Sequence, residues 1–118
     1  MASHDRLDWH KISQDHIYQK VSGIWYFVGG NVSVREFILA LQSGGSVEEF
    51  LRNFNQNVTK DQVLAVMKFI QKNTILPIKK FFEDFENART VEEFLDFTPY
   101  TKAEVDASFN LILNNLTA

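Results

Sequence analysis

The pattern of residues 46–70 recurs in residues 90–112, and this repeat limits the possible folds more than any other feature of the chain. The first stretch is SVEEFLRNFNQNVTKDQVLAVMKFI and the second is TVEEFLDFTPYTKAEVDASFNLI. Both start with Ser or Thr followed by Val-Glu-Glu-Phe-Leu, pass through turn-forming residues and end in a second run of periodic apolar residues. Such self-similarity indicates a chain that builds one supersecondary unit twice.

Two capping boxes mark where helices begin in the first stretch. In Ser46-x-x-Glu49 and Thr59-x-x-Gln62, each side chain can bond the backbone N–H of the other residue. After each box, apolar residues recur at the spacing of one helix face: Val47, Phe50, Leu51 and Phe54, then Val63, Val66, Met67 and Ile70. The pattern predicts helices over residues 47–54 and 60–71, joined by a short Asn-rich turn.

The same signals predict a third helix upstream, over residues 33–42. Ser33-x-x-Glu36 is another capping box, and Gly44-Gly45 follows as a stop signal. The apolar face of this helix is Val34, Phe37, Ile38 and Leu41. Residues 32–73 therefore form a three-helix unit whose last two helices have the helix-turn-helix arrangement.

A second, acidic three-helix unit is predicted in residues 74–118. At a constant offset of 44 positions, the apolar face of the 33–42 helix maps onto Ile78, Phe81, Phe82 and Phe85, just after Pro77. Further on, Thr101-x-x-Glu104 supplies one more capping box. Helices this short are marginal alone in water, so their apolar faces must be buried together. We expect a mainly α protein whose two tandem units pack as one body, with the phenylalanines in its core rather than around a ligand.

A β-hairpin is predicted within residues 1–31, ahead of the helices. Residues 17–21 and 24–28 are rich in β-branched and aromatic side chains and are separated by Ser22-Gly23. An isolated hairpin is marginal in water, and the second run needs cover on both faces. Its residues are Ile24, Trp25, Tyr26, Phe27 and Val28. Two kinds of cover are possible: the same hairpin of a second subunit, or the chain's own helices. We favour the first, which gives a homodimer.

The first 16 residues are mostly polar and are expected to form a loosely held arm. His4, His10 and His16 lie there, but none has the i, i+4 spacing of a zinc site on a helix, so we interpret them as surface histidines. The chain has no cysteine, which excludes disulfides and thiolate metal sites. It has no apolar run of membrane-helix length and no apolar secretory signal. We expect a cytoplasmic protein without membrane contact or cofactor.

The charges are distributed unevenly along the chain. Residues 1–73 hold eight Lys and Arg against seven Asp and Glu, whereas residues 74–118 hold four against eight. Because a phosphate-binding face needs clustered positive charge, the second unit is a poor nucleic-acid binder. The paired carboxylates Glu48/Glu49 and Glu92/Glu93 fall in first helical turns, where the helix dipole favours them without any catalytic role. No nucleophile, base and acid set stands out, so we do not expect an enzyme.

The helix-turn-helix arrangement makes DNA binding the first functional hypothesis. The N-terminal residues of the second helix of that motif face base edges, and here they are Thr59, Lys60 and Gln62, with Asp61 among them. Gln can read adenine, and Lys can read guanine or contact phosphate. The candidate contacts to the DNA backbone are Arg35, Arg52 and Lys68.

A framework of residues in the first half of the chain matches a known family pattern of spaced glycines, a Ser/Thr-x-Glu-Glu helix and a Thr-x-x-x-Val helix. The matching residues are Gly23, Gly29, Val34, Phe37, Ile38, Leu41, Gly44, Ser46, Val47, Glu48, Glu49, Thr59 and Val63. With this framework, residues 12–70 resemble the prokaryotic family catalogued as domain of unknown function 433. The resemblance implies a homeodomain-like helix-turn-helix fold. Because some members look like antitoxins, it also implies a dimer that binds DNA and a nuclease-type toxin protein.

Two hypotheses from different classes follow. In the first, the protein is an antitoxin-like, DNA-binding regulator. In the second, it is a protein-protein interaction module without DNA binding, which meets a basic partner through its acidic C-terminal copy.

Overall fold

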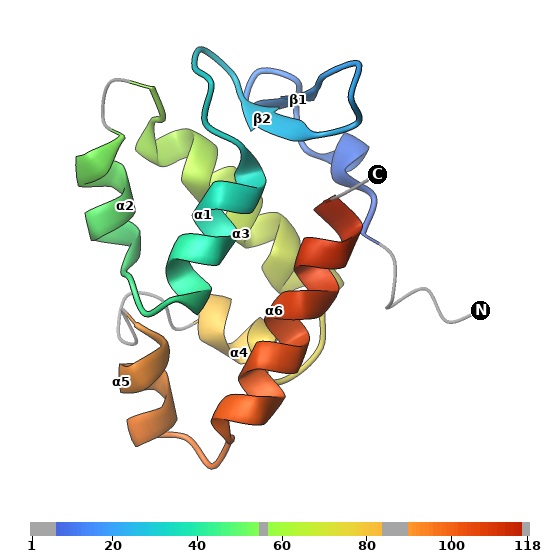
Figure 1. The fold of residues 1–118 in the computed structure, drawn as a ribbon. Helices are drawn as coiled ribbons and strands as arrows, with labels where there is room; N and C mark the ends of the chain where they lie inside the picture. Colours follow the sequence, from blue (N-terminus) through green and yellow to red (C-terminus); the bar gives the residue numbers. More distant parts are fainter. Residues whose placement is uncertain (1–6, 55–56, 84–89, 117–118) are drawn as a thin grey trace.

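Helices make up most of the structure, a computed structural model that describes residues 7–54, 57–83 and 90–116. A small two-stranded antiparallel sheet precedes them (Figure 1). The described elements are the 3₁₀-helix η2 (Trp9–Lys11), strands β1 (Ile17–Gln19) and β2 (Trp25–Phe27), and helices α1 (Val34–Gln42), α2 (Val47–Asn53), α3 (Lys60–Asn73), α4 (Ile78–Glu83), α5 (Val91–Asp96) and α6 (Lys102–Leu116). The predicted mainly α class is confirmed.

The first three helices begin where the capping boxes place them. At Ser33, Ser46 and Thr59 the hydroxyl accepts from the N–H three residues on, and the side chain there bonds back to the cap N–H. The predicted apolar faces of α1 and α3 are buried. Local capping and 3.6-residue periodicity were therefore sufficient to place these helices.

The hairpin forms with a longer loop and shorter strands than predicted. Ile17 lies opposite Phe27, and Gln19 lies opposite Trp25. Beyond them, the N–H of Lys20 donates to the Ile24 carbonyl (3.0 Å), which leaves a three-residue loop instead of the two-residue Ser22-Gly23 turn. Gly23 has a φ of +92°, and its N–H donates to the Lys20 carbonyl (2.8 Å). This is a type I turn followed by a left-handed glycine, the usual three-residue hairpin loop.

The chain's own helices cover the inner face of the hairpin. Phe27 is fully buried, with its ring centroid 6.2 Å from that of Phe37 on α1 and 6.3 Å from that of Phe50 on α2. Trp25 is also buried. Of the two alternatives for the cover, the chain's own helices therefore bury Phe27, and the Trp25 ring contacts that of His10 in the residues before the hairpin. A homodimer through the hairpin stays a prediction. Ile24, Tyr26 and Val28 are half-buried.

The second half of the chain repeats the capping signals. Thr90 accepts from the N–H of Glu93 at the start of α5 (3.1 Å), and Thr101 and Glu104 bond each other's N–H at the start of α6 (3.2 and 2.8 Å). Pro77 immediately precedes α4. Phe85, the expected last member of the apolar face there, lies outside the described residues. The interpretation of the two halves as copies of one unit stays a prediction.

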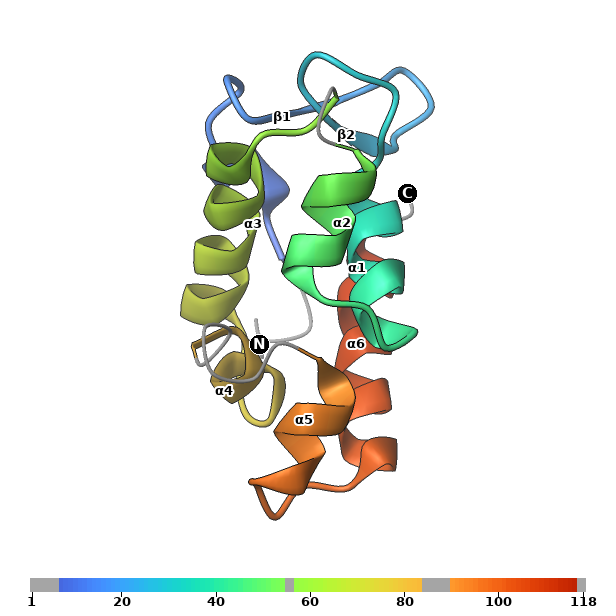
Figure 2. The same ribbon diagram turned by 90° about the vertical axis from the view of Figure 1, so that its left-hand side faces the viewer.

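The two groups of helices share one core. Helix α1 packs against α6, and α3 packs against α4, so contacts cross the expected boundary between residues 73 and 74. Phe81 lies at the centre of the second group, with ring centroids 5.5 Å from Phe94 and 5.7 Å from Phe109. The hairpin lies at one end of the helices and α5 at the opposite end (Figure 2). None of the described helices has the length and apolar character needed to cross a membrane.

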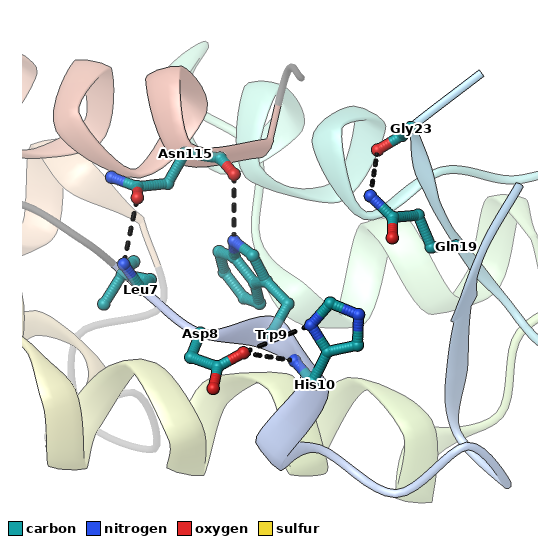
Figure 3. Close-up of polar contacts among 7 residues, drawn as sticks. All are labelled: Leu7, Asp8, Trp9, His10, Gln19, Gly23 and Asn115. Carbon is teal, nitrogen blue, oxygen red and sulfur yellow. Dashed lines mark hydrogen bonds and ion pairs between the residues drawn. The ribbon is translucent and has the colours of Figure 1, made fainter. Parts of the chain in front are cut away.

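The N-terminal segment, defined here as residues 7–16, is docked on the helices. The backbone N–H of Leu7 donates to Oδ1 of Asn115 (2.9 Å), and the indole N–H of Trp9 donates to the Asn115 carbonyl (3.2 Å) (Figure 3). Trp9 is 2% exposed, and its ring centroid lies 5.1 Å from that of Phe69 on α3. From Leu7 onward, the expected loosely held arm is therefore wrong, because Leu7, Trp9 and Ile12 belong to the core.

Candidate functional site

Two of the predicted base-reading residues, Thr59 and Gln62, form hydrogen bonds within the protein. The Thr59 hydroxyl accepts from the N–H of Gln62 (3.3 Å), and Oε1 of Gln62 accepts from the Thr59 N–H (2.9 Å). Nε2 of Gln62 donates to the carbonyl of Val28 (2.7 Å), and Gln62 is 7% exposed. Both ends of the Gln62 amide are thus bonded inside the protein, which does not favour adenine reading by this residue, and DNA contact at Thr59 and Gln62 stays a prediction.

The other predicted DNA contacts lie on three different helices. Lys60 is exposed in the first turn of α3, beside the exposed Asp61. Arg35 is half-buried on α1, and Arg52 is exposed in the last turn of α2. Lys68 is one of the residues that line a groove beside α3.

That groove, which we call the basic groove, runs between the N-terminal segment and the outer side of α3. Its volume is about 450 Å³. One wall comes from Lys11, Ile12, Ser13 and His16, and the other from Ala65, Lys68, Phe69, Lys72 and Asn73. The buried rings of Trp9 and Phe69 hold the two walls together at their base.

The electrostatic character of the basic groove comes from Lys11, Lys68 and Lys72. All three are exposed, and none makes a hydrogen bond or an ion pair with the described residues. Among the residues that the structure describes, no carboxylate lines the groove. Lys68 and Lys72 lie one helical turn apart, about 6 Å along the axis. Like charges at this spacing repel and cost helix stability, so the groove concentrates positive charge that an anion would neutralise.

The sequence carried a partial signal for this groove. Lys68 and Lys72 could have been paired from their i, i+4 spacing on the outer face of α3. Lys11 and His16 could not, because they reach the groove only through the docking of Trp9 on Phe69 and Asn115. Neither docking partner is close to Trp9 in the sequence.

A second cavity, which we call the aromatic pocket, adjoins the basic groove across the N-terminal segment. Its volume is about 330 Å³, and it is lined by His10, Ile12, Gln14, Tyr18, Gln19 and Trp25. Ile12 lines both cavities. His10 and Lys11 are consecutive, and each faces a different one.

The opposite end of the molecule is acidic. Glu92, Glu93 and Asp96 on α5 are exposed, and Phe97, directly after α5, is 52% exposed. Its ring centroid lies 6.3 Å from that of the buried Phe94. This end combines negative charge with an exposed aromatic ring.

The chain was compared with protein-family models, with curated proteins and with solved structures, and none of them matches it. Membership of the domain of unknown function 433 family stays a prediction.

Proposed function

We propose that the protein is a non-enzymatic nucleic-acid-binding protein that contacts phosphates in the basic groove. The observation that carries this proposal is the convergence of Lys11, Lys68 and Lys72 on one groove whose described lining holds no carboxylate. Lysines that bond no other described residue are suited to phosphates, since each phosphate contact releases counterions from the nucleic acid. The net charge of −3 does not oppose this, because the negative excess lies in residues 74–118.

The regulator hypothesis is a narrower form of this proposal. The antitoxin-like role, a toxin partner and homodimerisation rest on the resemblance of residues 12–70 to the family. The groove shifts the expected contacts away from Thr59 and Gln62, towards the middle and C-terminal part of α3. Lys60 and Lys68 thus become alternatives that one experiment can separate.

The test is fluorescence anisotropy with labelled nucleic acid at low and near-physiological salt. Lys68→Glu is expected to weaken binding at least tenfold, because it replaces an attraction to phosphate by a repulsion. Lys60→Glu is expected to have the smaller effect. Lys102→Glu is the control, since it makes the same charge change at an exposed first helical turn of α6, away from the groove, where it also removes the ion pair with Asp106 (3.2 Å), so its fold is checked by circular dichroism. If all three variants bind alike, the basic groove is not the site.

The second candidate function is a protein-protein interaction module that uses the acidic end. The exposed ring of Phe97 beside the carboxylates of α5 favours it, because exposed aromatic side chains with a charged rim are typical of protein interfaces. Reversing Glu92 and Glu93 to Lys is expected to weaken binding to a basic peptide library. Unchanged peptide binding would count against this function and leave the nucleic-acid proposal untouched.

A further inference from the structure

The aromatic pocket has the size and the side chains to hold a flat heterocycle. Tyr18, His10 and Trp25 contribute rings to its lining. The rings of His10 and Trp25 meet edge to face, with centroids 4.9 Å apart at 81°. Tyr18 is half-buried on β1 and packs beside Tyr26 at 6.3 Å. The burial of Trp25 and the packing of Tyr18 on Tyr26 order these two rings before any ligand arrives, and a prearranged surface loses little entropy on binding.

The polar groups of the aromatic pocket offer hydrogen bonds to the edge of such a ring. Nδ1 of His10 lies 3.2 Å from Oδ1 of Asp8, so Nε2 is the nitrogen left available (Figure 3). Nε2 of Gln19 donates to the Gly23 carbonyl (2.9 Å), which leaves Oε1 as an acceptor. Gln14 is exposed and has no partner among the described residues, so it offers both a donor and an acceptor.

We propose that the ligand is a single-stranded nucleic acid, with a base in the aromatic pocket and the neighbouring phosphates in the basic groove. This inference rests on the proposed function. Its basis is the adjacency of the two cavities, which share Ile12 and are lined by the consecutive residues His10 and Lys11. A charged groove that follows the backbone beside aromatic rings that stack bases is the usual arrangement for single strands.

A duplex fits this arrangement less well. Its bases are stacked and paired, so a base must leave the helix before it can enter a pocket, and this costs free energy that a single strand does not spend. The protein should therefore prefer a single strand, although both forms present phosphates to Lys68 and Lys72.

The test measures binding of the full-length protein to a labelled 12-nucleotide oligothymidylate and to a duplex of the same length. Oligothymidylate is expected to bind at least tenfold more tightly. Tyr18→Ala should weaken its binding by about 5- to 100-fold, and Gln14→Ala by about 2- to 10-fold. Duplex binding should change less than twofold in either variant. Gln14 is exposed, so its variant keeps the test valid if Tyr18→Ala loses stability.

Phe97→Ala is the matched aromatic control, because it removes an exposed ring from the opposite end of the molecule. Equal affinity for the two forms, or Tyr18 and Gln14 variants that behave like Phe97→Ala, would overturn the single-strand proposal. In that case, loss of binding to both forms in Lys68→Glu would still support the proposed function. If neither form binds the unmodified protein, both proposals fail. Displacement of the oligonucleotide by equimolar thymidine monophosphate would also overturn the proposal, because a free nucleotide would then suffice.

Discussion

The indole nitrogen of Trp9 donates a hydrogen bond to the backbone carbonyl of Asn115, 3.2 Å away and 106 positions later in the chain. The Asn115 side chain completes the link by accepting from the N–H of Leu7. These bonds hold the N-terminal segment across α3 and α6. They also position Lys11 and His16 on one wall of the basic groove.

Trp9 should therefore contribute strongly to the free energy of unfolding. We expect Trp9→Ala to lower it by about 3–5 kcal/mol, as is usual for a buried aromatic residue. Trp9→Phe, which keeps a ring beside Phe69 but loses the hydrogen bond, should lower it by about 1 kcal/mol. Urea denaturation followed by circular dichroism measures both, with His10→Ala as the exposed neighbouring control. Equal losses for the two Trp9 variants would mean that the hydrogen bond, not the ring packing, holds the segment.

Gln62 should be a structural residue rather than a base reader. Gln62→Ala leaves the Thr59 N–H and the Val28 carbonyl without their partner, and we expect a loss of about 1–3 kcal/mol. Gln71→Ala, on the same helix and with no side-chain bond to another described residue, should stay within about 0.5 kcal/mol of the unmodified protein. Nucleic-acid affinity, measured well below the melting temperature, should be unchanged in both. A base-specific loss of affinity in Gln62→Ala would restore the original prediction.

Phe27 should stabilise the monomeric chain. Phe27→Ala is expected to lower the free energy of unfolding by about 3–5 kcal/mol, whereas Val21→Ser, at the fully exposed hairpin tip, should have almost no effect. Because the cover comes from α1 and α2, the denaturation midpoint should not depend on protein concentration. A midpoint that rises with concentration would indicate that folding is coupled to association, as in a homodimer.

The salt dependence of nucleic-acid affinity should reveal how many lysines of the basic groove contact phosphates. The slope of log affinity against log salt reports the number of phosphates neutralised. Lys72→Ala should reduce its magnitude by about 0.7 for a single strand and about 0.9 for a duplex. Titrations at four or more salt concentrations give the slope, and Lys102→Ala should leave it unchanged. An unchanged slope in Lys72→Ala would place the phosphates elsewhere.

The parts of the fold that depend on neighbouring residues were predictable. Capping boxes at Ser33, Ser46 and Thr59 act over three residues, so the sequence alone located the starts of α1, α2 and α3. The capping box at Thr59 also bears on the role of Gln62. A glutamine that caps its own helix has one end of its amide occupied, so Gln62 was a poor choice for reading bases.

The parts that depend on distant contacts were not predictable. No residue close to Trp9 in the sequence indicates that its partners are Phe69 and Asn115. Without knowledge of these contacts, the composition of the N-terminal segment predicts a polar arm. The cover of the hairpin was left between two alternatives for the same reason. Hydrophobicity shows that Phe27 must be buried, but it does not show which surface buries it.

The link between Leu7, Trp9 and Asn115 also has a consequence for the timing of biosynthesis. During translation the N-terminal segment leaves the ribosome before α6, but the residue that it bonds, Asn115, lies in the last turn of α6. The first three helices can form while the wall carrying Lys11 and His16 is still unattached. Packing of Trp9 on Phe69 can begin once α3 has formed, but the two hydrogen bonds to Asn115 wait for α6, so the wall that carries Lys11 and His16 gains its last attachment when α6 docks.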